Sequence, residues 1–169
     1  MAYCFISDLH LQEDRPDITQ AFIGFLDTTA KEAERLYILG DLFEAWIGDD
    51  LKTELSLIIK EKLSLLNDSS TIIFAMHGNR DFLIGEKFCE DTGITLLDDP
   101  CKLELFGKAT LLMHGDLLCT KDVDYQEFRN ASRDPQWRKE FLNKPIAVSY
   151  THLRAHETEA DLVCRLLLE

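Results

Sequence analysis

The sequence has 169 residues, a length that suits one domain with a sizeable buried core. Its formal net charge of −13 argues against nucleic acid as the main partner, because binding to a phosphate backbone needs clustered Lys and Arg. An anionic substrate would therefore need local cations, of which bound metal ions are the obvious source.

Five cysteines are scattered along the chain without any Cys-x-x-Cys pair. This pattern is typical of a reducing compartment, where a buried cysteine acts as a small apolar residue. The apolar run after Met1 stops at Ser7, too early for a signal peptide. No apolar run reaches the length of about 18 residues that a membrane span needs. The sequence therefore predicts a cytoplasmic protein.

Short apolar runs alternate with helical patterns along the first half of the chain. The predicted elements, in chain order, are a strand at 3–7, a helix at 17–33, a strand at 36–39, a helix at 51–66, a strand at 71–76 and a helix at 85–92. The first helix is expected to begin with a capping box formed by Asp17 and Gln20.

A β-hairpin is predicted at 102–106 and 109–113, joined at Gly107-Lys108, and the segment after Asp122 is predicted to be helical. The alternation of strands and helices, with continuous apolar strands, predicts a layered α/β fold with a mostly parallel sheet. Ligands of such sheets bind beyond the carboxyl ends of the strands. The residues at these ends are therefore the first candidates for function.

Each predicted strand, and the hairpin, ends in a polar cluster. The clusters are Asp8-Leu9-His10, Gly40-Asp41, Gly78-Asn79-Arg80-Asp81 and His114-Gly115-Asp116. Because loops at the carboxyl ends of parallel strands converge on one edge of the sheet, these clusters are expected to meet. We therefore interpret five of these residues as metal ligands: Asp8, His10, Asp41, Asn79 and His114.

The ligand types mix oxygen with imidazole nitrogen and include no cysteine. This mixture suits Mn²⁺, Fe²⁺ or Zn²⁺ better than a structural thiolate zinc site. A central carboxylate such as Asp41 could bridge two ions roughly 3.5–4 Å apart, a pair that activates water and clamps the oxygens of a phosphate. Arg80 could present its planar fork to a phosphate oxygen that does not react.

Other polar residues have a structural interpretation. His77 is expected to be a satisfied histidine at the edge of the core, because its alternation along the chain opposes the partners of Asn79. Asp49 and Asp50 are expected to lie in a solvated turn, and residues 98–100 in another.

Together these motifs resemble the calcineurin-like metallophosphoesterase superfamily. The longer segments at 37–50, 77–83 and 113–120 resemble the UDP-2,3-diacylglucosamine pyrophosphohydrolases of lipid A biosynthesis. The resemblance covers residues 1 to about 147. It implies an α/β layered metallophosphoesterase fold, an incomplete β-sandwich flanked by helices, with 1–147 as the N-terminal part of the domain.

The resemblance also implies a reaction. Water activated by two metal ions would hydrolyse the pyrophosphate bond of UDP-2,3-diacylglucosamine to UMP and 2,3-diacylglucosamine 1-phosphate (lipid X). Two Mn²⁺ ions are implied, with Fe²⁺ or Zn²⁺ as alternatives. Asp8, His10 and Asp41 would hold one ion. Asp41, Asn79 and His114 would hold the other and act as the catalytic residues.

Substrate contacts are implied at Asn79, Arg80 and Asp122, with Tyr125 close by. The implied partner is the UDP-linked diacylated glucosamine, and its acyl chains imply peripheral association with the cytoplasmic face of the inner membrane. No nucleic acid and no protein partner is expected.

The superfamily pattern includes a late Gly-His-x-His pair that gives each metal a further imidazole, and this sequence contains none. The late histidines, His152 and His156, are four residues apart and lack that context. We therefore expect the 169-residue chain itself to have little or no activity, even with added Mn²⁺.

Residues 148–169 do not resemble the family. We interpret them as a translated sequencing adapter, a non-native tail on a truncated gene. Two alternatives are an amphipathic helix over 162–167 and a pair of helical metal ligands at His152 and His156. Resequencing genomic DNA across codon 148 separates them, since a continuous native reading frame would exclude the adapter.

Two other functions stay open beside the lipid A reaction. One is a related phosphoesterase acting on another nucleotide-sugar or on a phosphodiester, which a comparison of UMP release with aryl phosphodiester hydrolysis distinguishes. The other is an inactive metal-binding fragment, which gains weight from the missing imidazoles because loss of ligand support weakens metal sites.

Overall fold

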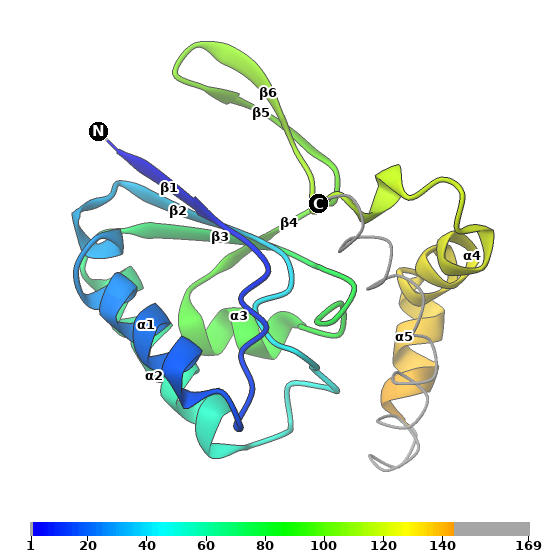
Figure 1. Cartoon of the computed structure of the whole chain (residues 1–169), viewed down its shortest axis with the longest axis horizontal. Coiled ribbons are helices and arrows are strands. Elements are labelled where there is room, and N and C mark those ends of the chain that lie inside the picture. The colour runs from blue at the N-terminus through cyan, green and yellow to red at the C-terminus, as the bar shows by residue number, and fades with distance from the viewer. Residues whose placement is uncertain (1, 144–169) are drawn as a thin grey trace. The chain divides into compact units, whose positions relative to one another are not determined.

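The computed structural model describes residues 2–143, which fall into two compact units, one up to residue 114 and one from residue 115 onward. The first unit is built on a parallel sheet with the strand order β1-β2-β3-β4 (Figure 1). Its strands are β1 (Tyr3–Ile6), β2 (Arg35–Leu39), β3 (Ile72–Met76) and β4 (Thr95–Leu97). Each strand lies beside the one before it, and crossovers between parallel strands are right-handed, so the connecting helices share one face.

Three helices cover that face. They are α1 (Pro16–Asp27), α2 (Glu54–Asp68) and α3 (Glu86–Thr92), with a short 3₁₀ turn, η1 (Ala30–Glu32), before β2. Successive residues of a strand point to opposite faces, so Leu36 and Ile38 of β2 face the helices while Tyr37 faces away. All three side chains are buried. The central strand is therefore covered on both sides.

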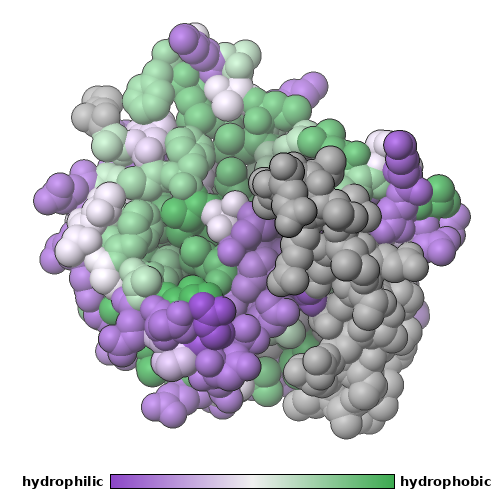
Figure 2. All heavy atoms as spheres, in the orientation of Figure 1, coloured by the Kyte–Doolittle hydropathy of each residue, from purple (hydrophilic) through white to green (hydrophobic). Residues whose placement is uncertain are grey.

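An antiparallel hairpin covers the opposite face of the sheet. Its strands are β5 (Cys101–Leu105) and β6 (Lys108–Leu112). Leu105 and Leu112 are buried with Tyr37 and Met76 in one hydrophobic cluster. The space-filling view shows hydrophobic side chains gathered over this part of the molecule (Figure 2). The sheet is thus layered between helices and hairpin, which leaves its carboxyl-end loops free to form a site.

The second unit contains α4 (Val123–Ser132) and α5 (Pro135–Leu142), preceded by the 3₁₀ turn η2 (Asp116–Leu118). Both helices begin with an aspartate cap. Asp122 accepts a hydrogen bond from the backbone N–H of Tyr125 at 3.0 Å, and Asp134 accepts one from Trp137 at 2.9 Å. The ring of Trp137 stacks on Phe141 with centroids 4.8 Å apart. These contacts support the helical structure expected after Asp122.

The predicted α/β class with a mostly parallel sheet is confirmed, and the three predicted strands are present as β1, β2 and β3. The prediction lacks β4, because three residues carry too little pattern. Helix α2 begins at Glu54, later than expected, because Thr53 caps it. The Thr53 hydroxyl accepts from the N–H of Ser56 at 3.1 Å, and the Ser56 hydroxyl accepts from the N–H of Thr53 at 3.0 Å.

The helix predicted at 17–33 is wrong at both ends. It begins at Pro16, whose ring fixes φ and whose missing N–H costs nothing at the first helical position. The proposed capping box is wrong, because Asp17 lies inside the first turn and its carboxylate accepts from Arg15 at 2.9 Å. The helix ends at Asp27, and η1 follows in place of its last turns.

The hairpin prediction is shifted by one residue. Its two-residue turn is Phe106-Gly107, with φ of 52° and 76°, not Gly107-Lys108. A type I′ turn needs positive φ at both central positions and matches the twist of the flanking strands. The glycine therefore occupies the second turn position, and Lys108 begins β6.

Within residues 2–143, no helix combines the length and the apolar character that crossing a membrane requires. The cysteines in this part of the chain are free thiols: Cys4, Cys89, Cys101 and Cys119. The predicted tail at 148–169 and its boundary after residue 147 lie outside the described residues and stay predictions.

Candidate metal centre

The loops after β1, β2, β3 and β6 carry the five predicted ligands: Asp8, His10, Asp41, Asn79 and His114. The pairing of β1 with β2 continues into the loops. The N–H of Asp8 donates to the carbonyl of Gly40 at 3.2 Å, and the N–H of His10 donates to the carbonyl of Asp41 at 3.0 Å. Backbone hydrogen bonds therefore hold the first two ligand loops side by side.

Three of the ligands have a left-handed backbone, with φ of 55° at Asp8, 48° at His10 and 52° at Asp41. Such conformations cost non-glycine residues on the order of 1–3 kcal/mol each, and they cluster at functional sites. One ligand atom from each of the three residues lies within 4.8 Å of the other two. The strained turns thus bring carboxylates and imidazole to one point.

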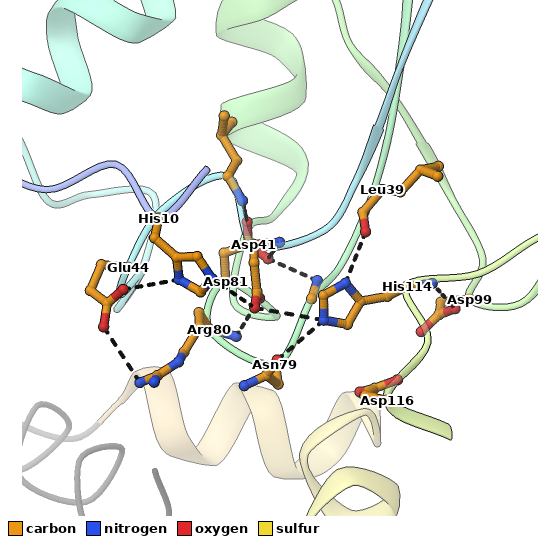
Figure 3. Close-up of polar contacts among 12 residues, drawn as sticks. His10, Leu39, Asp41, Glu44, Asn79, Arg80, Asp81, Asp99, His114 and Asp116 are labelled. Atoms are coloured by element: carbon orange, nitrogen blue, oxygen red, sulfur yellow. Dashed lines mark hydrogen bonds and ion pairs between the residues drawn. The ribbon is translucent and has the colours of Figure 1, made fainter. Parts of the chain in front are cut away.

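The carboxylate of Asp41 stands at the middle of the cluster (Figure 3). Its Oδ2 lies 3.8 Å from Nε2 of His10 and 3.6 Å from Nε2 of His114. Its Oδ1 accepts the backbone N–H of Arg80 at 2.9 Å. One buried carboxylate between two imidazoles is the arrangement expected of a ligand that bridges two metal ions.

The electrostatics of Asp41 favour a bound cation. The pKa of Asp41 is raised from 3.8 to about 6, chiefly by burial and also by the neighbouring Asp81, against the opposing effect of His114. A carboxylate that is costly to ionise in the folded chain gains most when a positive charge is placed beside it.

The imidazole of His114 is oriented by the main chain. The carbonyl of Leu39 can only accept, so Nδ1 of His114 donates to it, at 2.9 Å. In the neutral ring, Nε2 then turns its lone pair toward Oδ1 of Asn79, 3.1 Å away, and toward Asp41. Nε2 of His114, Oδ1 of Asn79 and Oδ2 of Asp41 each offer a lone pair, and they lie close together. Such a set of nitrogen and oxygen ligand atoms fits a divalent metal ion.

Asp81 joins the loops after β2 and β3. Its carboxylate, 1% exposed, accepts backbone N–H groups of Asp41 at 3.3 Å, Leu42 at 2.8 Å and Gly78 at 2.8 Å. Burial raises the pKa of Asp81. The sequence placed Asp81 in a motif but gave it no role. Two of its hydrogen-bond partners, Asp41 and Leu42, lie 40 and 39 residues away in the chain, so no local pattern connects them with Asp81.

Two glycines let these loops approach closely. A Cβ added at Gly40 would lie 2.6 Å from Nδ1 of His114 and 2.8 Å from the backbone of Gly78. A Cβ at Gly78 would overlap the carboxylate and the backbone nitrogen of Asp41. Only glycine fits at these positions, so the glycines of the motifs are explained by packing around the ligands.

We expect Gly78→Ala to destabilise the protein by about 1–3 kcal/mol, the usual cost of inserting a methyl group into a packed site. It should also weaken metal binding, because Asp41 must move. Gly24→Ala is the matched control: nothing lies within 4 Å of its added Cβ, and alanine in helix α1 should stabilise by up to about 1 kcal/mol. Chemical denaturation of both variants measures the difference, and equal stabilities would contradict the packing argument.

The interpretation of Asp49 as a solvated turn residue is wrong. Its carboxylate accepts from the indole N–H of Trp46 at 2.9 Å and from the backbone N–H groups of Gly85 and Phe88 at 3.1 and 3.0 Å. Asp49 therefore caps helix α3 from a distant loop. Asp50 is exposed, as expected.

His77 is confirmed as a satisfied histidine, because Nε2 lies 2.7 Å from the carbonyl oxygen of Ile84. The predicted turn at 98–100 has a further role. Oδ1 of Asp99 accepts the backbone N–H of His114 at 3.0 Å, and so helps to place this ligand.

Arg80 lies beside the ligands in the first unit. Its side chain is buried, and its NH1 is 3.8 Å from Oε1 of Glu44. Glu44 also lies 2.9 Å from Nδ1 of His10. The longer segment at 37–50 contains Glu44, but the prediction gives it no role.

Asp122 and Tyr125, the other predicted substrate contacts, belong to the second unit. Asp122 caps α4, and the hydroxyl of the buried Tyr125 donates to Asp116 at 2.5 Å. Burial, followed by the charge of Asp116, raises the pKa of Tyr125 well above its ordinary value. Asp116 also accepts from Nε of Arg129 at 2.9 Å. Substrate contact by Asp122 and Tyr125 stays a prediction.

The family profile described as calcineurin-like phosphoesterase matches residues 1–169. The chain is similar to curated proteins called UDP-2,3-diacylglucosamine hydrolase. The one from Marinobacter nauticus is 57% identical over 146 residues, which are 86% of this chain and 60% of the relative. The one from Pseudomonas entomophila is 61% identical over 130 residues, 77% of this chain and 54% of the relative. The chain thus spans little more than half the length of these relatives.

A protein with the same name from Pseudomonas putida KT2440 is 49% identical over 161 residues, which are 95% of this chain and 67% of the relative. This alignment continues past residue 147. Resequencing across codon 148 is therefore the experiment that decides the origin of residues 148–169.

Proposed function

The chain belongs to the calcineurin-like phosphoesterase family, and from that membership we propose its reaction. It carries most of the catalytic centre of an enzyme that hydrolyses the pyrophosphate bond of UDP-2,3-diacylglucosamine. Water attacks one phosphorus of the pyrophosphate and the bond to the bridging oxygen breaks, which yields UMP and 2,3-diacylglucosamine 1-phosphate. The observation that carries the proposal is the carboxylate of Asp41 held between the imidazoles of His10 and His114.

The names of the relatives support the substrate. Proteins that are 57% and 61% identical to this chain are called UDP-2,3-diacylglucosamine hydrolases.

The donor set supports two Mn²⁺ ions, with Fe²⁺ or Zn²⁺ as alternatives, because carboxylate, amide oxygen and imidazole all serve Mn²⁺ well. Asp8, His10 and Asp41 would hold one ion, and Asp41, Asn79 and His114 the other. Divalent ions bound there would lower the pKa of water and neutralise the oxygens of the reacting phosphate.

The residues of the chain have separate tasks in this proposal. Asp41 would contribute its carboxylate to both ions, and Leu39 fixes the tautomer of His114. The guanidinium of Arg80 binds a phosphate oxygen and offsets its charge, a contribution that a chain of net charge −13 needs locally. Asp122 and Tyr125 would contact the substrate.

We further propose peripheral association with the cytoplasmic face of the inner membrane. The substrate carries two acyl chains and therefore resides in a lipid surface. Among residues 2–143 no helix can cross a membrane.

A chimera tests the reaction. Residues 1–143 of this chain would replace the matching segment of the Marinobacter nauticus relative, and UMP release from UDP-2,3-diacylglucosamine would be measured with Mn²⁺. We expect turnover within tenfold of that of the relative, and loss of turnover in the same chimera with Asp41→Ala. A folded chimera that prefers a simple aryl phosphodiester would overturn the proposed substrate.

A metal-binding chain without turnover is the second candidate, favoured by the lack of a Gly-His-x-His pair in the sequence. We expect the 169-residue chain to bind Mn²⁺ but to release far less UMP than the chimera. Robust UMP release by the purified chain, lost in Asp41→Ala, would contradict this expectation.

A further inference from the structure

The side chain of Glu44, in the loop after β2, lies near both the predicted metal ligand His10 and the predicted phosphate-binding Arg80 (Figure 3). Its Oε2 is 2.9 Å from Nδ1 of His10, within hydrogen-bonding reach, although the approach is not aligned as a hydrogen bond. Its Oε1 is 3.8 Å from NH1 of Arg80. The two oxygens of one carboxylate thus face two different functional groups.

The contact with His10 has a chemical consequence. An ionised carboxylate can only accept hydrogen bonds, so it favours the tautomer of neutral His10 that carries its hydrogen on Nδ1. The lone pair is then on Nε2, the nitrogen that lies 3.8 Å from Oδ2 of Asp41. The other candidate imidazole, His114, is held in the same tautomer by the carbonyl of Leu39.

The main chain fixes Glu44 on both sides. The N–H of Glu44 donates to the carbonyl of Leu11, next to His10, at 3.1 Å. Two residues later, the N–H of Trp46 donates to the carbonyl of Arg80 at 3.2 Å. The backbone at Glu44 is therefore connected to the loops of both groups that its carboxylate faces.

Arg80 in turn restrains Glu44. The side chain of Arg80 is only 6% exposed, whereas that of Glu44 is 36% exposed. A half-exposed glutamate on its own would sample several rotamers, and a buried positive charge near one oxygen narrows that choice. The ion pair therefore keeps the other oxygen facing His10.

We propose that Glu44 is a positioning residue that accepts the Nδ1–H of His10 and so aims Nε2 at the metal held with Asp8 and Asp41. The inference rests on the proposed metal centre but not on the identity of the substrate. Partners of this kind typically change metal affinity or activity about 10–100-fold when they are lost.

Three variants test the inference. Glu44→Ala removes the acceptor, Glu44→Gln keeps an oxygen that can accept from Nδ1–H, and Glu61→Ala removes an exposed glutamate from helix α2 as a control. Mn²⁺ affinity would be measured with MnCl₂ by the electron paramagnetic resonance of free Mn²⁺. The tautomer of His10 would be read from ¹⁵N chemical shifts of the metal-free protein at pH 8.5.

We expect Glu44→Ala to bind Mn²⁺ roughly 10–100-fold more weakly and to shift hydrogen from Nδ1 toward Nε2 of His10. Glu44→Gln should restore the wild-type tautomer and bind Mn²⁺ more tightly than Glu44→Ala, and Glu61→Ala should match the wild type. Thermal unfolding would show that each variant is folded. The inference requires both changes in Glu44→Ala, so wild-type affinity or a wild-type tautomer overturns it. Neither readout depends on UMP release, so failure here is distinct from failure of the proposed reaction.

Discussion

Asp41→Asn is expected to abolish tight binding of divalent metal and, at the same time, to stabilise the metal-free protein at pH 8. Asparagine keeps the size of the side chain and an oxygen that can accept the N–H of Arg80, but it removes a buried negative charge. Burial raises the pKa of Asp41 to about 6. Ionising this group in the folded chain therefore costs on the order of 2–3 kcal/mol relative to the unfolded chain.

The sign of the pH dependence follows from that shift. A carboxyl group whose pKa is higher in the folded than in the unfolded chain makes the fold lose stability as the pH rises between about 4 and 6. Above that range the loss is complete. The advantage of Asp41→Asn over the wild type should therefore be smaller at pH 5 than at pH 8.

Thermal unfolding of EDTA-treated proteins at both pH values measures this advantage, and Mn²⁺ titration measures the lost affinity. Asp8→Asn is the matched control, because Asp8 is an exposed ligand whose charge is not buried. It should weaken Mn²⁺ binding without stabilising the metal-free protein. Equal stability of Asp41→Asn and the wild type at pH 8 would show that the buried charge of Asp41 does not destabilise the folded protein.

Asp81→Ala is expected to have the largest effect on folding. It would leave the backbone N–H groups of Asp41, Leu42 and Gly78 buried without their acceptor. Each such loss costs roughly 1–3 kcal/mol, so the three together cost about 3–9 kcal/mol, comparable with the whole stability of a typical domain. We expect a largely unfolded protein at 37 °C.

Urea denaturation followed by circular dichroism measures this loss. Asp50→Ala is the control, because Asp50 is an exposed aspartate of the neighbouring loop and its replacement should change stability by no more than about 0.5 kcal/mol. Asp81→Asn, which keeps one acceptor oxygen, should fall between the two. A stable Asp81→Ala protein would show that water or a shifted backbone can replace the carboxylate.

The ligand cluster of the first unit could be predicted from the sequence because it depends on strand ends. Once three apolar strands are parallel, the loops after them must converge, and Asp8, His10 and Asp41 are brought together by that rule alone. The metal-binding chemistry proposed for the five predicted ligands followed from residue type. Neither inference needed the exact register of the sheet.

The supporting contacts could not be predicted, because they join residues far apart in the sequence. Asp49 reaches α3 across more than thirty residues, and Asp81 reaches the loop after β2 across a similar distance. Local patterns carry no information about such pairs. The error at Asp17 is different in kind: a local capping signal competed with Pro16, and the proline prevailed.

The consecutive order of the parallel strands has a consequence for synthesis on the ribosome. Among residues 2–143 the sheet grows at one edge, since each new strand adds beside the last and none of them must insert between strands already paired. The centre can therefore assemble in the order in which the chain emerges. Asp8 and Asp41 meet when β2 pairs, Asn79 joins with β3, and His114 arrives last. During translation, each strand of this sheet can pair with a strand that has already been synthesised.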